Sequence, residues 1–145
     1  MKYIREIKTQ YHILKDTAVF EANSPLKVAE YLTNWIGLED RENFVALYVD
    51  NKNRVVRRKT ISIGTSTSSI IDPKEIFHSA VETKACGFIV AHNHPSGIAS
   101  PSREDIDCTK RLYECGKLMG IPMLDHVIVV HDSLGYYSMK ENGHV

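Results

Sequence analysis

The chain has 145 residues, the length of one domain with a buried core, and its 18 basic and 18 acidic residues leave no formal charge. This balance does not favour binding to phosphate backbones or anionic lipid, and three cysteines without CxxC spacing fit a reducing compartment. The start "MKYIREIKTQ" lacks the apolar core of a signal peptide, and no apolar run approaches the roughly 18 residues of a membrane span, so we expect a cytoplasmic protein with no membrane partner.

The first elements are predicted after about 20 residues without a clear pattern. A helix is predicted over 25–36, because Ser24 can cap its N-terminus, apolar residues recur at helical spacing and Gly37 ends it. A continuous apolar run at 44–50 and an alternating run at 54–63 follow, separated by the turn "DNKN". This pair predicts a β-hairpin.

Helices and strands alternate through the rest of the chain. A second helix is predicted after Asp72, which caps it and forms a capping box with Glu75. A third helix is predicted between Ser102 and Gly120. Strands are predicted at 86–92, 126–130 and 135–139. This order predicts an α/β sandwich with a mixed sheet.

The motif with the clearest chemistry is "HNHPSGIASPSRED". His92 and His94 lie two residues apart at the end of a predicted strand, so both imidazoles can point to one side and hold one ion. Asp105 supplies a third ligand from the first turn of the helix that Ser102 caps. Catalytic zinc takes three such ligands and a water, whose pKa it lowers. The Ser102 hydroxyl, beside that water, could donate to an oxyanion.

Each of these residues also has a purely structural explanation. Ser102 and Asp105 form an ordinary capping box by themselves, and a lone His-x-His pair needs no metal. The joint spacing of strand end, Pro-Gly-rich loop and capped helix favours the metal site.

The same stretch resembles the JAMM signature of MPN-domain metalloproteins. The segments "HNHPSG", "PSREDI", "GIPMLDHVIV" and "YYS" are similar specifically to the RadC family. The resemblance covers 24–145 and leaves 1–23 as an N-terminal extension. It excludes an HNH nuclease, whose motif is spread over a ββα unit.

The resemblance implies a cytidine-deaminase-like α/β/α sandwich with a zinc ion, Zn2+, held by His92, His94 and Asp105. It implies that Ser102 helps to stabilise a tetrahedral intermediate. The expected activity is cleavage of an amide or isopeptide bond by zinc-activated water, in a peptide or isopeptide substrate. The family also implies a link to DNA repair.

Two features depart from the pattern that the resemblance implies. JAMM hydrolases use an upstream glutamate as general acid/base, expected shortly before Gly64-Thr65, where "RRKTISIGT" has none and Lys59 stands near its place. A lysine accepts a proton only if its pKa is strongly depressed. In addition, from its 145 residues we expect the chain to do without the helix-hairpin-helix segment of longer RadC proteins. The alternative is a non-catalytic zinc-containing accessory or binding module for DNA transactions.

Two further features allow two interpretations each. Asp125 and His126 either orient a metal ligand or simply begin a strand. The basic run "RVVRRK" at 54–59 either touches phosphates or forms a solvated face of an edge strand. That edge strand could also pair with a second copy of the chain to form a homodimer.

Overall fold

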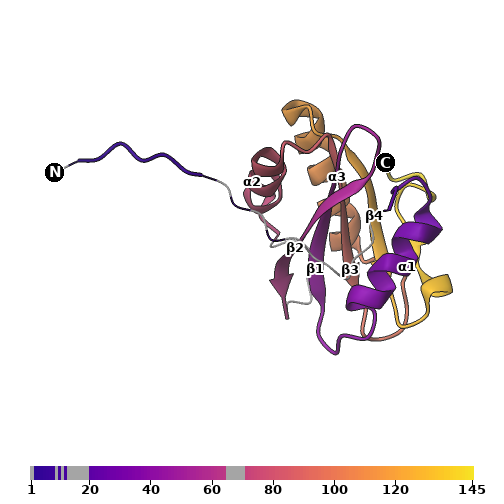
Figure 1. The fold of residues 1–145 in the computed structure, drawn as a ribbon. Coiled ribbons are helices and arrows are strands. Elements are labelled where there is room, and N and C mark those ends of the chain that lie inside the picture. Colours follow the sequence, from indigo (N-terminus) through magenta and orange to yellow (C-terminus); the bar gives the residue numbers. More distant parts are fainter. Residues whose placement is uncertain (1, 9, 11, 13–19, 65–70) are drawn as a thin grey trace.

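The computed structural model describes residues 2–8, 10, 12, 20–64 and 71–145 (Figure 1). In chain order its elements are α1 (Pro25–Ile36), β1 (Asn43–Val49), β2 (Val55–Ile63), α2 (Pro73–Thr83), β3 (Gly87–Asn93), α3 (Arg103–Met119), β4 (Met123–Val129), the short 3-10 helix η2 (Ser133–Gly135) and β5 (Tyr137–Ser138). The predicted helices and the hairpin are therefore confirmed, with boundaries within a few residues of those expected.

The N-terminal segment is described only in part. Much of the predicted extension 1–23 lies outside the described residues, and so does Thr65. The described residues 20–22 lie against the beginning of β2, where the Val55 N–H donates to the Phe20 carbonyl oxygen at 2.9 Å. Residues 2–8 run away from the body of the domain (Figure 1).

The strands form one mixed sheet in the order β2-β1-β3-β4-β5. β1 runs antiparallel to both β2 and β3, β3 and β4 are parallel, and β5 is antiparallel to β4. The beginning of β1 therefore lies beside the end of β3, and Phe44 is paired with His92. This pairing decides which loops meet at the histidine motif.

Helices cover both faces of the sheet, α1 on one side and α2 with α3 on the other (Figure 1). The core under α1 contains Val28, Ala29, Leu32, Ile36, Val45, Leu47, Ile89, Ala91, Val127 and Val129. The opposite core includes Phe44, Ala46, Tyr48, Ile76, Phe77, Phe88, Val90, Cys108 and Leu112. Because both faces are buried, β1 and β3 are apolar along most of their length rather than alternating. The predicted α/β/α sandwich with a mixed sheet is confirmed.

The helix caps agree with the sequence in two cases and differ in one. The Ser24 side chain accepts from the Lys27 N–H at the start of α1. At α2 the Asp72 side chain accepts from the Lys74 N–H, whereas the Glu75 N–H donates to the Asp72 backbone carbonyl. The capping box expected there is therefore wrong, although Asp72 is the N-cap. The box at the start of α3 is formed.

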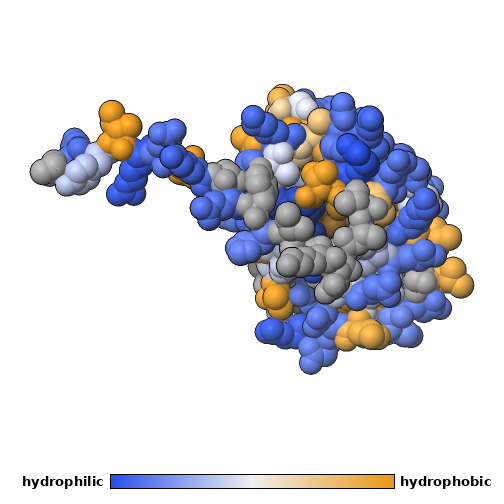
Figure 2. All heavy atoms as spheres, in the orientation of Figure 1, coloured by the Kyte–Doolittle hydropathy of each residue, from blue (hydrophilic) through white to orange (hydrophobic). Residues whose placement is uncertain are grey.

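The surface seen in Figure 2 is mostly hydrophilic, with apolar side chains scattered over it. Within the described ranges, no helix combines the length and the apolar character needed to cross a membrane.

Candidate metal centre

His92 and His94 lie where β3 ends and the following loop begins. His92 is fully buried, and the Phe44 ring stacks on its imidazole at 5.9 Å between centroids and 10° between planes. His94 follows the strand, and its Nδ1 lies 2.8 Å from the Ile98 carbonyl oxygen. A carbonyl oxygen only accepts, so Nδ1 carries a proton, and in the neutral imidazole His94 Nε2 presents a lone pair.

A tight turn after His94 allows its imidazole to contact the Ile98 carbonyl oxygen. The Gly97 N–H donates to the His94 carbonyl oxygen at 3.1 Å, and Gly97 has φ +84°. This left-handed conformation favours glycine and explains "HPSG" as a turn signal. The turn brings the Ile98 carbonyl back over the imidazole.

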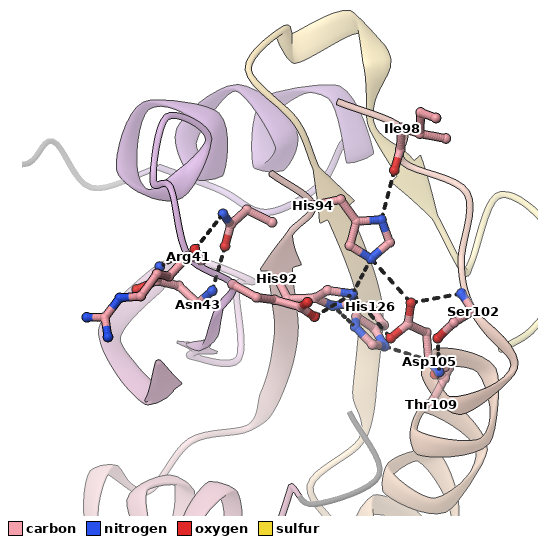
Figure 3. A network of polar contacts seen from close by, with 11 residues as sticks. Arg41, Asn43, His92, His94, Ile98, Ser102, Asp105, Thr109 and His126 are labelled. Carbon is pink, nitrogen blue, oxygen red and sulfur yellow. Dashed lines mark hydrogen bonds and ion pairs between the residues drawn. The ribbon is translucent and has the colours of Figure 1, made fainter. Parts of the chain in front are cut away.

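Asp105 reaches the same point from the first turn of α3. Its Oδ2 accepts from the Ser102 N–H at 2.9 Å, and the Ser102 Oγ accepts from the Asp105 N–H at 3.1 Å. The capping box therefore fixes the direction of the carboxylate as well as the start of the helix. Its Oδ1 lies 3.3 Å from His92 Nε2, and its Oδ2 lies 3.4 Å from His94 Nε2 (Figure 3).

A second carboxylate, Glu42, accompanies these three residues. It immediately precedes β1, its side chain is 17% exposed, and its Oε1 lies 3.7 Å from His92 Nε2. A glutamate was expected shortly before Gly64, whereas the carboxylate that lies beside the histidines comes from the segment before β1. Lys59 lies within β2, paired with Ala46, whereas the antiparallel pairing of β1 and β3 brings Glu42 to the histidines.

The four residues form a group compatible with a metal ion. One ligand atom from each of Glu42, His92, His94 and Asp105 lies within 4.8 Å of the others. Zinc–nitrogen bonds near 2.0 Å in a tetrahedron separate the ligand atoms by about 3.3 Å. His92 Nε2 lies 3.0 Å from His94 Nε2 and 3.3 Å from Asp105 Oδ1, close to that spacing. Imidazole nitrogens and carboxylate oxygens together suit a divalent ion.

The charge state of the group reflects its partial burial. Burial raises the pKa of Glu42 above its ordinary value, the imidazoles of His92 and His94 oppose this, and the Asp105 carboxylate adds to it. When His94 is charged, its Nε2 also carries a proton and donates to Asp105; this hydrogen bond raises the pKa of His94, while burial opposes that shift. Glu42 therefore holds a proton more readily than an exposed glutamate, which suits a group that takes up and returns protons.

Comparison with known proteins identifies the family. The model of the RadC-like JAB domain matches residues 22–144, which is most of the chain. The chain belongs to the RadC-like JAB domain family. This confirms the family expected from the histidine motif.

Two relatives illustrate the extent of the match. A UPF0758 protein of Geobacillus sp. (strain WCH70) is 47% identical over 122 residues, covering 84% of this chain and 53% of the relative. A UPF0758 protein of Bacillus cereus (strain AH187) is 44% identical over 126 residues, covering 87% of this chain and 55% of the relative. The chain thus spans about half the length of the curated relatives that it matches.

In this RadC-like domain, the residue between the two histidines holds the segment that carries Glu42. Asn93 is fully buried, and its Oδ1 accepts from the Asn43 N–H at 2.6 Å. Its Nδ2 donates to the carbonyl oxygens of Arg41 at 3.0 Å and Glu39 at 3.2 Å. The Asn93 amide therefore connects the end of β3 to the backbone on both sides of Glu42.

Replacing Asn93 with alanine is expected to lower the free energy of unfolding. The substitution leaves the buried Asn43 N–H without its side-chain acceptor, and an unsatisfied buried group costs about 1–3 kcal/mol. Urea unfolding measures the loss. Asn23→Ala is the matched control, because the Asn23 amide bonds only at the surface in the contact described, to Glu21. Equal stability of the two variants would contradict the role of Asn93.

Asp125 and His126 separate into different roles. The Asp125 carboxylate accepts from the Ser138 hydroxyl at 2.6 Å, the Lys140 N–H at 3.0 Å and the His126 N–H at 2.7 Å. These bonds tie β4 to β5 and the C-terminal turn. His126 lies behind His92 instead, with its Nε2 2.9 Å from His92 Nδ1.

The arginines of the basic run are engaged within the domain. Arg57 forms an ion pair with Glu82 at 2.7 Å, and the Arg58 guanidinium lies 4.4 Å from the centre of the Trp35 ring. Both side chains thus have intramolecular partners on the helices that flank the sheet. β2 is an edge strand of the sheet, as expected.

Proposed function

We propose that the domain is a zinc-dependent hydrolase that cleaves an amide or isopeptide bond in a peptide substrate. His92, His94 and Asp105 would hold the zinc ion, and Glu42 would act as the general base. The observation that carries the proposal is the Glu42 carboxylate, partly buried and 3.7 Å from His92 Nε2, beside three groups suited to zinc.

The chemistry divides between the ion and the chain. Zinc, when bound, supplies a Lewis acid that polarises the substrate carbonyl and lowers the pKa of an attacking water. Glu42 accepts a proton from that water as its oxygen bonds to the carbonyl carbon. Glu42 then returns the proton to the leaving nitrogen as the C–N bond breaks. A carboxylate can both accept a proton and return it, so one side chain serves both transfers.

Ser102 is proposed as the donor to the carbonyl oxygen. Its Oγ accepts from the Asp105 N–H at 3.1 Å, and a hydroxyl that accepts one bond still has its own proton to donate. The capping box places this hydroxyl next to the Asp105 carboxylate (Figure 3). A donor directed at the developing oxyanion stabilises the transition state.

The observations favour this hydrolase over a non-catalytic accessory of DNA transactions. The non-catalytic alternative rested on the absence of a glutamate shortly before Gly64. Glu42 supplies a carboxylate beside the histidines from another segment. The partners of Arg57 and Arg58 within the domain also give no support to a phosphate-binding run.

Metal analysis of protein purified without added metal tests the proposal. We expect about one equivalent of zinc in the wild type and less than about 0.2 in His92→Ala, because the ligand set loses an imidazole. His78→Ala, on the exposed side of α2, is the matched control and is expected to keep its zinc. A wild type that holds less than about 0.2 equivalents of zinc, with no further loss in His92→Ala, would contradict the proposed metal site.

Cleavage is tested on the same samples. A fluorogenic peptide and a peptide joined through a lysine side chain serve as probes for amide and isopeptide hydrolysis. Activity that disappears with a chelator and returns with zinc supports the hydrolase. A zinc-loaded wild type that cleaves neither probe would favour the non-catalytic alternative.

A further inference from the structure

A chain of hydrogen bonds extends from His92 into the core, away from Glu42. His92 Nδ1 lies 2.9 Å from Nε2 of His126, and His126 Nδ1 lies 2.7 Å from the Thr109 Oγ1. The Thr109 hydroxyl in turn donates to the Asp105 backbone carbonyl at 2.8 Å. His92, His126 and Thr109 are all fully buried. We infer that Thr109 and His126 fix the tautomer of His92 so that its Nε2 lone pair faces the metal position.

The direction of the chain follows from what each group can donate. A carbonyl oxygen only accepts, so the single proton of the Thr109 hydroxyl is used on Asp105. Thr109 Oγ1 therefore accepts from His126 Nδ1–H. A neutral imidazole has one donor and one acceptor nitrogen, so His126 Nε2 accepts from His92 Nδ1–H. His92 Nε2 is then left with a lone pair.

The reverse direction would block metal binding. If Thr109 donated to His126 Nδ1, then His126 would donate from Nε2 to His92 Nδ1. His92 would then carry its proton on Nε2, the atom that lies 3.0 Å from His94 Nε2 and 3.3 Å from Asp105 Oδ1. That proton would occupy the space between the candidate ligands.

The two histidines of the motif thus differ in how their tautomers are set. His94 donates from Nδ1 to the Ile98 carbonyl, a group that can only accept, as is usual for the outer nitrogen of a ligand. His92 faces another imidazole, which by itself can donate or accept. Thr109 removes this ambiguity, because its own proton is committed to the helix that also carries Asp105. Thr109 and His126 are therefore positioning residues rather than ligands.

This inference rests on the proposed metal site, and titration of the metal-free domain with Co2+ tests both separately. Thr109→Val has nearly the same shape and removes the hydroxyl. We expect it to weaken Co2+ binding about 10–100-fold, the usual effect of losing an outer-shell partner. Thr109→Ser restores the hydroxyl and is expected to return the affinity to within about threefold of wild type.

The matched control is Thr33→Val. The Thr33 hydroxyl makes the same bond to a carbonyl one helical turn earlier, Ala29 at 2.7 Å, but lies on α1. It is expected to leave Co2+ affinity unchanged. Equal affinities of wild type, Thr109→Val and Thr109→Ser would overturn the inference and leave the metal site standing. A wild type that does not bind Co2+ would overturn both.

A spectroscopic readout needs no variant. Long-range 1H–15N spectra of the histidine rings in the zinc-loaded wild type report which nitrogen carries each proton. We expect Nδ1–H on both His92 and His126. A proton on His126 Nε2 would overturn the inference, even if every variant folded poorly.

Discussion

Glu42→Gln is expected to lower kcat at least about 100-fold while the zinc stays bound, because general-base catalysis contributes roughly 10²–10⁴-fold. Glutamine has nearly the same size as glutamate but cannot accept the proton of the attacking water. The proposed ligands His92, His94 and Asp105 are untouched, so metal content should stay near that of the wild type. Steady-state kinetics and metal analysis of the same preparation measure the two quantities.

Glu39→Gln is the matched control for this prediction. Glu39 is exposed in the same segment, and its backbone carbonyl, not its carboxylate, accepts from the Asn93 amide. It should therefore keep both the activity and the metal. If Glu42→Gln cleaved as fast as Glu39→Gln, Glu42 would not be the base. If it lost both the activity and the metal, Glu42 would be a ligand.

Glu42 marks the limit of what the sequence could predict. His92 and His94 are joined by strand periodicity, and Ser102 and Asp105 by the capping box, so local spacing was sufficient for them. Glu42 lies 50 residues before His92 and reaches it only because β1 and β3 are antiparallel neighbours. Sequence periodicity gives strands but not their order. A polar residue just before a buried strand was the available signal.

The same reasoning applies to the residues behind the site. His126 lies in a segment expected to be a strand, and either of two roles was open for it. The choice depends on the parallel register of β3 and β4, which pairs Val90 with His126. Thr109 gave no signal, because its role depends on how α3 packs against β4. The layered fold, by contrast, followed from alternating elements and apolar strands buried on both faces.

Asp105→Asn is expected to weaken metal binding at least about 1,000-fold, or about 4 kcal/mol. Loss of an outer-shell partner alone lowers metal affinity roughly 10–100-fold. Asp105 is proposed as a direct ligand, with its Oδ1 3.3 Å from His92 Nε2, so its loss should cost more. Asparagine keeps an amide oxygen that can accept from the Ser102 N–H. It loses the negative charge and turns a donor toward the imidazoles. Competition with a chromophoric chelator measures the affinity.

Ser102→Ala separates the two roles of Asp105. It removes the hydroxyl that accepts from the Asp105 N–H at 3.1 Å, and loss of an N-cap costs about 1 kcal/mol of stability. The carboxylate remains, so the affinity for zinc should fall far less than in Asp105→Asn. If the two variants released the metal equally, the cap and not the carboxylate would control the site. Asp105 would then be a structural residue that happens to lie beside two histidines.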